Sequence, residues 1–175
     1  MKKTWMIYGA NGYTGKLIAR QARQRGLTPI LAGRNRAGIA AIAAETGFDS
    51  LVFDLEDTAA LDQALQGISI VLHCAGPFSA TSQPMIEACL RNACHYLDIT
   101  GEISVFANAH KQSDEARRAD IVLLPGAGFD VVPTDCLAAK LVKALPAATA
   151  LCLAFEAAGG LSPGTAKTSI EGLAG

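Results

Sequence analysis

The sequence has almost no net charge and no long apolar run. Its 175 residues include 15 Lys and Arg against 16 Asp and Glu, which gives a formal net charge of −1. This balance gives no general attraction to nucleic acid or to an anionic membrane. No run of about 18 apolar residues occurs either, so we expect no membrane span. Because hydrophobic residues make up 50% of the chain, the sequence predicts a soluble globular protein with a buried core.

The sequence also lacks the cysteine pattern of a disulfide framework or a metal cluster. It has five cysteines, an odd number, and no Cys-x-x-Cys pair. All five lie in apolar or helical stretches, so we expect reduced thiols in the core of a cytoplasmic protein, and no metal site. Cys94-His95 is the only close pair of soft ligands, and we interpret it as a helix end that runs into a strand. The other cysteines are Cys74, Cys89, Cys136 and Cys152.

Short apolar segments alternate with helical patterns along most of the chain. The apolar segments predict strands at residues 4–8, 29–32, 50–53, 68–74, 95–99 and 121–124. The patterns between them predict helices at residues 13–24, 37–46, 58–66, 83–92 and 105–118, and the first helix should bury Leu17, Ile18 and Ala22. Parallel strands need crossover connections, and helical crossovers cover both faces of the sheet. The sequence therefore predicts an α/β fold, a doubly wound parallel sheet of the Rossmann type.

The stretch IYGANGYTGK places three glycines directly after the first predicted strand. A mononucleotide P-loop is excluded, because Ala10 stands where its first glycine should be and Leu17 follows the lysine where a hydroxyl is needed. The spacing is instead a G-x-x-G-x-x-G variant of the dinucleotide fingerprint, within a β-α-β unit of about 30 residues. The alternative is a strand-to-helix turn that merely needs a positive φ.

In the dinucleotide interpretation each glycine has its own role. Gly9 makes the turn, Gly12 lets the backbone approach the pyrophosphate, and Gly15 lets the helix pack close to the sheet. The same loop is lined by Asn11, Tyr13 and Thr14. The Thr14 hydroxyl could contact phosphate or cap the helix, and the sequence does not separate the two roles.

The second strand runs into LAGRNR, which has no acidic residue to hold the ribose 2′-hydroxyl of NAD. Arg34 and Arg36 would instead suit the 2′-phosphate of NADP, with Asn35 between them. The alternative is a solvated loop. Asp54 ends the third strand and could hydrogen-bond the adenine amine, although a capping or solvated role fits this residue equally well.

The fourth strand ends in VLHCAGPF. Ala75, Gly76 and Pro77 form a small, bent segment at the carboxyl edge of the sheet, where doubly wound folds bind their ligands. We assign this segment to the ribose and nicotinamide half of the cofactor. His73 lies one step back in the strand, and we interpret it as a packed core histidine.

Acid–base candidates follow the fifth and sixth strands. They are Asp98, Thr100 and Glu102 in HYLDITGE, and Asp130, Thr134 and Asp135 in GFDVVPTD. Each also has a structural interpretation, as a loop anchor or as a cap of the next helix. As catalytic residues we favour Asp130, which has no obvious cap role, and Glu102, which we expect to be exposed at the mouth of the site. A short-chain dehydrogenase mechanism is excluded, because none of the three tyrosines has a lysine four residues later.

Five stretches together resemble one family. In their order and spacing, IYGANGYTGKLIA, LAGRN, VLHCAGPF, HYLDITGE and LLPGAGFDVVPTDCLA are similar to the saccharopine dehydrogenase-like oxidoreductases, which include the mycobacterial trans-acting enoyl reductases. The resemblance implies an NADP-binding Rossmann domain followed by an α/β substrate domain. The cofactor contacts that it implies are Gly9, Ala10, Asn11, Gly12, Tyr13, Thr14, Arg34, Asn35, Ala75, Gly76 and Pro77.

Members of this family are considerably longer, so the chain looks like an N-terminal fragment. Residues 1–145 would be the dinucleotide-binding domain, and residues 146–175 would begin a truncated substrate domain. A strand at residues 150–155 and a helix from near Thr165 would open that second domain.

Two functions remain open. The first is an NADPH-dependent oxidoreductase that transfers hydride to a carbonyl, imine or activated alkene of a small-molecule substrate. The isolated chain would then be inactive without its substrate domain. The second is a non-catalytic NADP-binding or redox-sensing module. The sequence identifies neither the substrate nor the direction of the reaction, and it leaves a homo-oligomer open.

Overall fold

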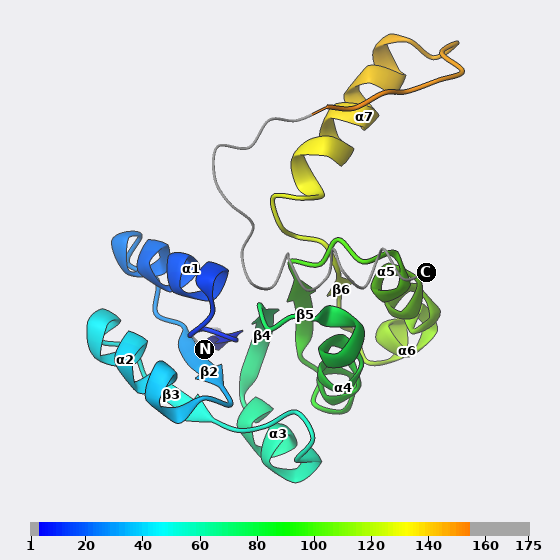
Figure 1. The fold of residues 1–175 in the computed structure, drawn as a ribbon. Helices are drawn as coiled ribbons and strands as arrows, with labels where there is room; N and C mark the ends of the chain where they lie inside the picture. Colours follow the sequence, from blue (N-terminus) through cyan, green and yellow to red (C-terminus); the bar gives the residue numbers. More distant parts are fainter. Residues whose placement is uncertain (1–3, 155–175) are drawn as a thin grey trace.

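The computed structural model describes residues 4–154, which form a parallel sheet with helices packed on it (Figure 1). The strands are β1 (Thr4–Tyr8), β2 (Ile30–Gly33), β3 (Ser50–Val52), β4 (Ile68–His73), β5 (His95–Asp98) and β6 (Leu123–Leu124). The helices are α1 (Tyr13–Gln24), α2 (Arg36–Thr46), α3 (Thr58–Leu65), α4 (Phe78–Arg91), α5 (Ile103–Lys111), α6 (Ser113–Arg118) and α7 (Val132–Ala144). The six strands lie in the order β3-β2-β1-β4-β5-β6. This is the Rossmann order, so the predicted doubly wound α/β fold is confirmed.

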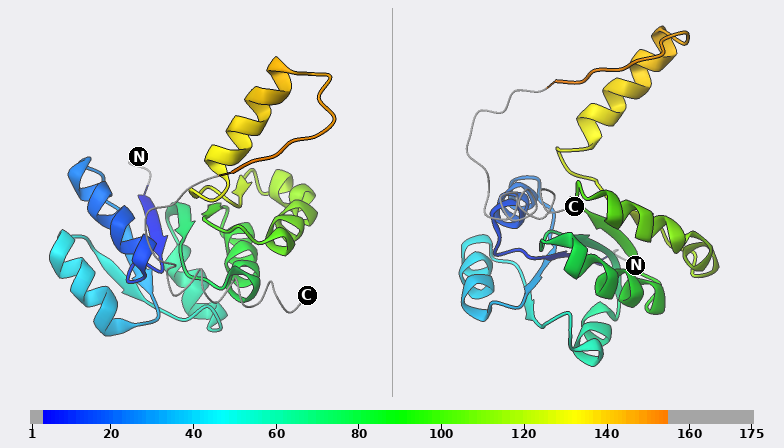
Figure 2. Two further views of the ribbon diagram at one scale, coloured as in Figure 1. Left: turned by 45° about the horizontal axis from the view of Figure 1, so that its top comes forward. Right: turned by 45° about the vertical axis from the view of Figure 1, so that its right-hand side comes forward.

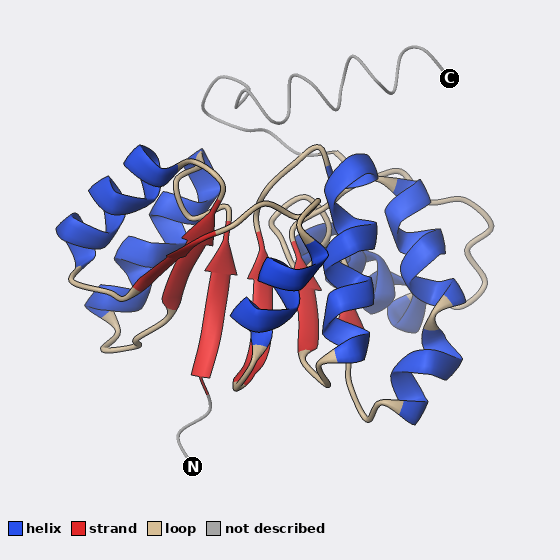
Figure 3. Cartoon of the chain, turned by 90° about the horizontal axis from the view of Figure 1, so that it is seen from below, coloured by secondary structure: helices blue, strands red, loops and turns tan. Residues whose placement is uncertain are grey.

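The two faces of the sheet carry separate cores, and β1 contributes to both. Ile7 packs in one cluster with Ala19 of α1 and Ile39 of α2. Its neighbours Met6 and Tyr8 pack in a second cluster, which includes residues of α3, α4, α5 and α6. Successive residues of a strand face opposite sides of the sheet, so an uninterrupted apolar strand supplies both cores. Figure 3 shows the sheet between these two groups of helices.

β1 lies between β2 and β4, and this position determines which loops meet at the carboxyl edge of the sheet. Tyr8 at the end of β1 lies opposite Ala32 in β2 and His73 in β4. The chain leaves β1 toward β2 on one side and later returns to β4 on the other, which creates a switch point at the carboxyl end of β1. The loops that follow these three strands therefore meet at one edge.

Most predicted elements agree closely with the observed ones, and β1 and α1 have the predicted bounds. Three differ. α4 begins at Phe78 instead of residue 83, because the carboxylate of the distant Glu102 accepts hydrogen bonds from the N–H groups of its first turn. The helix predicted at residues 105–118 is divided into α5 and α6 at Gln112, whose backbone leaves helical geometry (φ −88°, ψ 9°). Residues 150–154 do not form the predicted strand, and residue 155 and the helix from Thr165 lie outside the described residues.

α1 buries a narrower stripe than we predicted. Gly15, Ala19 and Ala22 are its buried residues, and they follow the spacing i, i+4 and i+7 of one helix face. Leu17 lies off this stripe and is 44% exposed, so the prediction that it is buried is wrong. Ile18 is half-buried. The small residues allow the helix to approach the sheet closely.

α7 projects away from the sheet, and none of its residues is buried (Figures 1 and 2). Cys136 in α7 and Cys152 after it are exposed, so the prediction of five core thiols is wrong for these two. Cys89 and Cys94 are buried and Cys74 is half-buried. The division of the chain at residue 145 stays a prediction. Within residues 4–154, no helix is long and apolar enough to cross a membrane.

His73 is a packed core histidine, as we predicted. Its side chain is fully buried, and its ring centroid lies 5.5 Å from those of Tyr8 and Phe78 and 6.1 Å from that of Tyr96. Nε2 lies 3.0 Å from the Thr81 hydroxyl oxygen. Nδ1 is the one buried side-chain nitrogen or oxygen in residues 4–154 without a hydrogen-bond partner. Desolvation lowers the pKa of His73 to about 3.

This burial predicts a loss of stability in mild acid. In the unfolded chain His73 gains a proton near pH 6.5, whereas the folded protein gains it only near pH 3, so the unfolded state binds more protons between these values. Between pH 7.5 and pH 5 the free energy of unfolding should fall by about 2 kcal/mol more in the wild type than in His73→Phe. Urea denaturation at both pH values measures the difference. Parallel pH profiles of the two proteins would contradict the prediction.

Candidate functional site

The loops after β1, β2 and β4 are joined at the carboxyl edge of the sheet. The N–H groups of Gly9 and Ala10 both donate to the carbonyl oxygen of Ala32 in β2, at 2.8 and 3.1 Å. On the other side, the N–H of Cys74 donates to the carbonyl oxygen of Tyr8, at the end of β1, at 2.8 Å. The structure therefore brings the predicted glycine loop beside residues 75–77, as the sequence led us to expect.

Two glycines of the first loop have no room for a side chain. Gly9 has a φ of +81°, and a Cβ on it would lie 2.8 Å from the backbone nitrogen of Ala75. A Cβ on Gly15 would collide with the carbonyl oxygen of Gly9. Gly9 therefore makes the turn and touches the segment after β4, while Gly15 lets α1 begin directly against the loop.

α1 begins without a side-chain cap. Its N-cap residue is Gly12, and no side chain among residues 4–154 caps the first turn with a hydrogen bond. The N–H groups of this turn and the helix dipole are therefore directed toward the loop, which is an arrangement that binds phosphate. Thr14 lies in the first turn and does not cap the helix. The phosphate contact that we expect from its hydroxyl stays a prediction. Tyr13 beside it is 69% exposed.

Asn11 connects the glycine loop to the loop after β2. A Cβ on Gly33 would lie 3.0 Å from Asn11 Oδ1, and a Cβ on Gly38 would lie 3.0 Å from Asn11 Cβ. Both glycines therefore leave space for the Asn11 side chain. Sequence reasoning missed this contact, although a glycine at position 38, within a predicted helix rich in alanine, was a signal of close packing.

The loop after β2 carries Arg34, Asn35 and Arg36. Arg34 is exposed at the end of the strand. Asn35 is the N-cap of α2, and its Oδ1 accepts a hydrogen bond from the N–H of Gly38 at 2.9 Å. Sequence reasoning missed this cap, which holds the shape of the loop. Arg36 is the first residue of α2.

Tyr8 interacts electrostatically with both Arg34 and Asp54. Its hydroxyl donates to the carbonyl oxygen of Phe53 at 3.3 Å. Burial, and to a smaller extent the charge of Asp54, raise the pKa of Tyr8 while the charge of Arg34 lowers it, and the net result is a pKa of about 12. Both charged groups therefore lie near one hydroxyl, at the ends of β2 and β3. Asp54 Oδ1 also accepts from the N–H of Glu56 at 3.2 Å, so this side chain holds its own turn.

Residues 75–77 form a wall beside the glycine loop. The segment contains a cis peptide bond between Gly76 and Pro77. The Thr81 hydroxyl lies within donating distance of the carbonyl oxygens of Ala75 (2.6 Å) and Pro77 (3.0 Å). Because Ala75 also contacts Gly9, the wall and the glycine loop are held together through their backbones.

Glu102 anchors the first turn of α4. Its carboxylate accepts hydrogen bonds from the N–H groups of Phe78 at 3.0 Å and Ser79 at 2.6 Å. The side chain is half-buried, so the expectation that it is exposed at the mouth of the site is wrong. Carboxylates are stabilised at helix N-termini by these N–H groups and by the dipole. No local pattern reveals the contact, because the partners lie 24 and 23 residues apart.

Asp98 anchors the loops after β5 and β6. Its buried carboxylate accepts from the Tyr96 hydroxyl at 2.6 Å, the Thr100 N–H at 3.0 Å and the Gly126 N–H at 2.8 Å. These bonds confirm that Asp98 ties down a loop. Burial, and then the nearby charge of Asp98, raise the pKa of Cys74 to about 12. The Cys74 thiol is therefore protonated at neutral pH.

Asp130 is exposed in the loop before α7. Its Oδ2 lies 4.0 Å from the position that a Cβ on Gly101 would occupy, so it stands beside the loop after β5. The Thr134 hydroxyl donates to the carbonyl oxygen of Val131 at 2.9 Å. Asp135 lies in the first turn of α7. A catalytic role for Asp130 or Glu102 stays a prediction.

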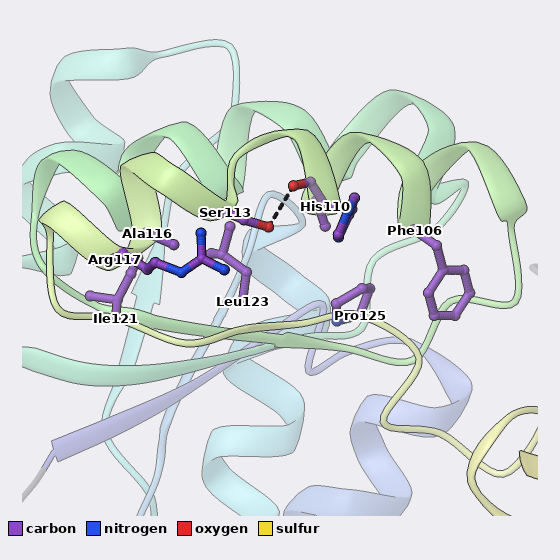
Figure 4. A pocket seen from close by; sticks show the side chains of 9 residues that line it. Phe106, His110, Ser113, Ala116, Arg117, Ile121, Leu123 and Pro125 are labelled. Atoms are coloured by element: carbon purple, nitrogen blue, oxygen red, sulfur yellow. Dashed lines mark hydrogen bonds between the residues drawn. The ribbon is translucent and has the colours of Figure 1, made fainter. Parts of the chain in front are cut away.

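A separate cavity of about 430 Å³ lies beneath α5 and α6 (Figure 4). It is lined by Phe106, Ala109, His110, Ser113, Ala116, Arg117, Ile121, Leu123 and Pro125. None of the predicted cofactor residues lines it, so we do not assign the cofactor there. Within residues 4–154, no group of three or more His, Cys, Asp or Glu side chains could hold a metal ion.

Comparison with known proteins shows the family. Residues 5–124 match the family model of the saccharopine dehydrogenase NADP binding domain. A saccharopine dehydrogenase-like oxidoreductase from Bos taurus is 25% identical over 152 residues, covering 74% of this chain and 35% of that protein. A trans-acting enoyl reductase from Mycobacterium leprae (strain TN) is 32% identical over 141 residues, covering 74% of this chain and 33% of that protein. The chain thus spans about a third of the length of these relatives.

Solved structures share the fold. Saccharopine dehydrogenase (L-Glu forming) from Saccharomyces cerevisiae matches with a TM-score of 0.72 at 17% identity, covering 82% of this chain and 31% of that one. A triphenylmethane reductase of Citrobacter sp., complexed with NADP(H), matches with a TM-score of 0.51 at 19% identity, covering 67% of this chain and 46% of that one.

The residues at the carboxyl edge fit NADP. A Cβ on Gly9 or Gly15 would fill the backbone cradle, the N-terminus of α1 has no side-chain cap, and Arg34 is an exposed cation at the end of β2. NADP is therefore the cofactor, and the chain belongs to the saccharopine dehydrogenase NADP-binding domain family.

Proposed function

We propose that the chain binds NADPH as the cofactor-holding part of an oxidoreductase, which transfers hydride to a carbonyl, imine or activated alkene of a small-molecule substrate. The observation that carries the proposal is the uncapped N-terminus of α1 beside the tight turn at Gly9, with the exposed Arg34 at the end of the next strand. The cofactor supplies the hydride chemistry, so the task of the protein is to bind and orient it.

The cofactor would lie along the carboxyl edge from β3 to β4. The pyrophosphate would meet the backbone of residues 9–14, including the Thr14 hydroxyl, at the start of α1. Arg34 would bind the 2′-phosphate, supported by the loop that Asn35 caps. The Asp54 carboxylate would accept a hydrogen bond from the adenine amine. The ribose and nicotinamide half would lie against the wall at residues 75–77, which places the reactive ring near the loops after β5 and β6.

Asp130 is the stronger of the two acid–base candidates. Its carboxylate is exposed beside the loop after β5, where a proton could be exchanged with a bound substrate. Glu102 instead uses both carboxylate oxygens to accept hydrogen bonds from the first turn of α4. We infer that Glu102 positions α4, and that proton transfer, where the reaction needs it, falls to Asp130.

The alternative is a non-catalytic NADP-binding or redox-sensing module. It is favoured by the observation that Asp98 and Glu102, two acidic residues at the edge, serve to hold the fold. Turnover of a substrate separates the two functions, because a binding module would bind NADPH without oxidising it. A homo-oligomer and a cytoplasmic location stay predictions under either function.

The first prediction concerns cofactor choice. A charge-assisted bond to the 2′-phosphate contributes about 1.5 to 3 kcal/mol, so NADPH should bind roughly 10 to 150 times more tightly than NADH. Arg34→Ala should remove most of this difference by weakening NADPH while NADH binding stays nearly unchanged. Raising the salt concentration should reduce the preference of the wild type. Isothermal titration calorimetry of NADPH and NADH against the wild type and Arg34→Ala measures these affinities.

Arg25→Ala is the matched control, since Arg25 is an exposed arginine at the far end of α1. It should leave both affinities unchanged. Equal affinities of the wild type for NADPH and NADH would show that Arg34 is an ordinary surface residue. An Arg34→Ala protein that loses NADH as badly as NADPH would show the same.

A second prediction separates the anchoring carboxylate from the catalytic one. Glu102→Gln keeps one carbonyl oxygen as an acceptor but loses the charge at the α4 N-terminus, so the free energy of unfolding should fall by about 1 kcal/mol. Asp130→Asn changes an exposed side chain and should alter stability by less than about 0.5 kcal/mol. Urea denaturation of both variants gives the comparison. If Glu102→Gln is as stable as the wild type, the bonds to α4 do not explain this residue.

A third prediction concerns turnover by the protein expressed from its whole natural reading frame. Asp130→Asn should lower kcat for NADPH oxidation by roughly 10² to 10⁴-fold, the range of a lost general acid, without changing NADPH affinity. Asp135→Asn, which changes an exposed carboxylate in the first turn of α7, should retain activity. NADPH absorbance with small carbonyl, imine and enoyl compounds follows the reaction. If the wild type turns over none of these compounds, the binding-module function is favoured.

A further inference from the structure

Thr81, the fourth residue of α4, connects the core to the wall. Its hydroxyl oxygen lies 2.6 Å from the carbonyl oxygen of Ala75 and 3.0 Å from that of Pro77. The same oxygen lies 3.0 Å from Nε2 of His73, which is buried at the end of β4. One side chain therefore contacts both ends of the wall and a core residue beneath it.

The proton on His73 follows from these three contacts. A threonine hydroxyl has one hydrogen, and the two carbonyl oxygens can only accept it. The Thr81 oxygen must then accept from the histidine, so His73 carries its hydrogen on Nε2 and donates. Nδ1 is left as a bare acceptor, and it is the buried nitrogen without a partner noted above.

This arrangement is poorly explained by packing alone. The rings of Tyr8, Phe78 and Tyr96 around His73 form an environment that a phenylalanine would fill without burying an unpaired nitrogen. What phenylalanine cannot supply is the Nε2 hydrogen that orients the Thr81 hydroxyl toward the wall. The polar ring is therefore explained by its bond to Thr81.

The wall that Thr81 holds is in direct contact with the glycine loop. A Cβ on Gly9 would lie 2.8 Å from the backbone nitrogen and 2.9 Å from the Cβ of Ala75, so the two segments are in close van der Waals contact. A wall that moves away from this position opens the site on the side opposite Arg34. Arg34 and Asp54, which we assign to the adenosine half, follow β2 and β3 on the other side of β1.

We propose that Thr81 and His73 are positioning residues which fix the wall so that the nicotinamide half of NADPH is held against it. The proposal rests on the assignment of residues 75–77 to that half of the cofactor. It predicts that loss of the Thr81 hydroxyl weakens binding of the nicotinamide ring selectively, while binding of the adenosine and phosphate groups is retained.

The test compares two ligands on the full 175-residue chain. NADPH and 2′-phospho-ADP-ribose differ only in the nicotinamide ring. Thr81→Val, which keeps the shape and removes the hydroxyl, should weaken NADPH about tenfold and 2′-phospho-ADP-ribose less than twofold. Thr81→Ser retains the hydroxyl and should restore NADPH binding to within about twofold of the wild type. The fluorescence of bound NADPH, which reports how the nicotinamide is held, should fall in Thr81→Val and return in Thr81→Ser.

A merely structural role would give a different result. If Thr81→Val weakens both ligands equally, in step with a lower melting temperature, or weakens neither, the proposal is overturned. Should Thr81→Val fail to fold, His73→Phe removes the orienting donor while filling the same space. It should weaken NADPH about threefold more than it weakens 2′-phospho-ADP-ribose. Equal effects of His73→Phe on the two ligands would also overturn the proposal. A wild type that binds 2′-phospho-ADP-ribose but gains nothing from the nicotinamide ring would show that the wall assignment itself is wrong.

Discussion

The glycine loop after β1 packs against its neighbours with no space for a side chain at its key positions. Gly9 touches the backbone of Ala75, Gly15 begins α1 directly against Gly9, and Gly38 receives the side chain of Asn11. These contacts bring the loops after β1, β2 and β4 to one edge of the sheet. Because the contact surface is backbone, N–H groups rather than side chains face the place where a pyrophosphate would lie. The rest of the site depends on this close approach.

The polar side chains at the same edge mainly hold loops in place. Asp98 accepts one hydrogen bond from Tyr96 within β5 and two from the loops after β5 and β6, and Glu102 accepts two from the start of α4. Thr81 does the same for the wall with one hydroxyl. A buried or half-buried carboxylate needs such donors, since leaving it unpaired is costly. Under the proposed function, these side chains anchor the loops while backbone groups contact the cofactor, and Arg34 is the main side chain expected to reach it.

Local features of the sequence were sufficient where the structure depends on local chemistry. The apolar run of β1 and the helical period of α1 predicted both elements with their observed bounds. The glycine spacing placed the turn at Gly9, and its φ is positive in the structure. His73 was recognised as a core residue because it continues an apolar strand. Leu17 was misplaced, since a helix pattern with apolar residues at several angles does not tell which stripe faces the sheet.

Taken alone, the sequence determined the order of strands and helices, the doubly wound class and the dinucleotide loop, because these follow from periodicity and from glycine at particular spacings. Only the tertiary structure decided which acidic residues are anchors. Glu102 meets Phe78 and Asp98 meets Gly126 across 24 and 28 residues of chain. Which donors surround a carboxylate depends on how strands and loops from distant segments meet at the sheet edge, and no local pattern contains that information.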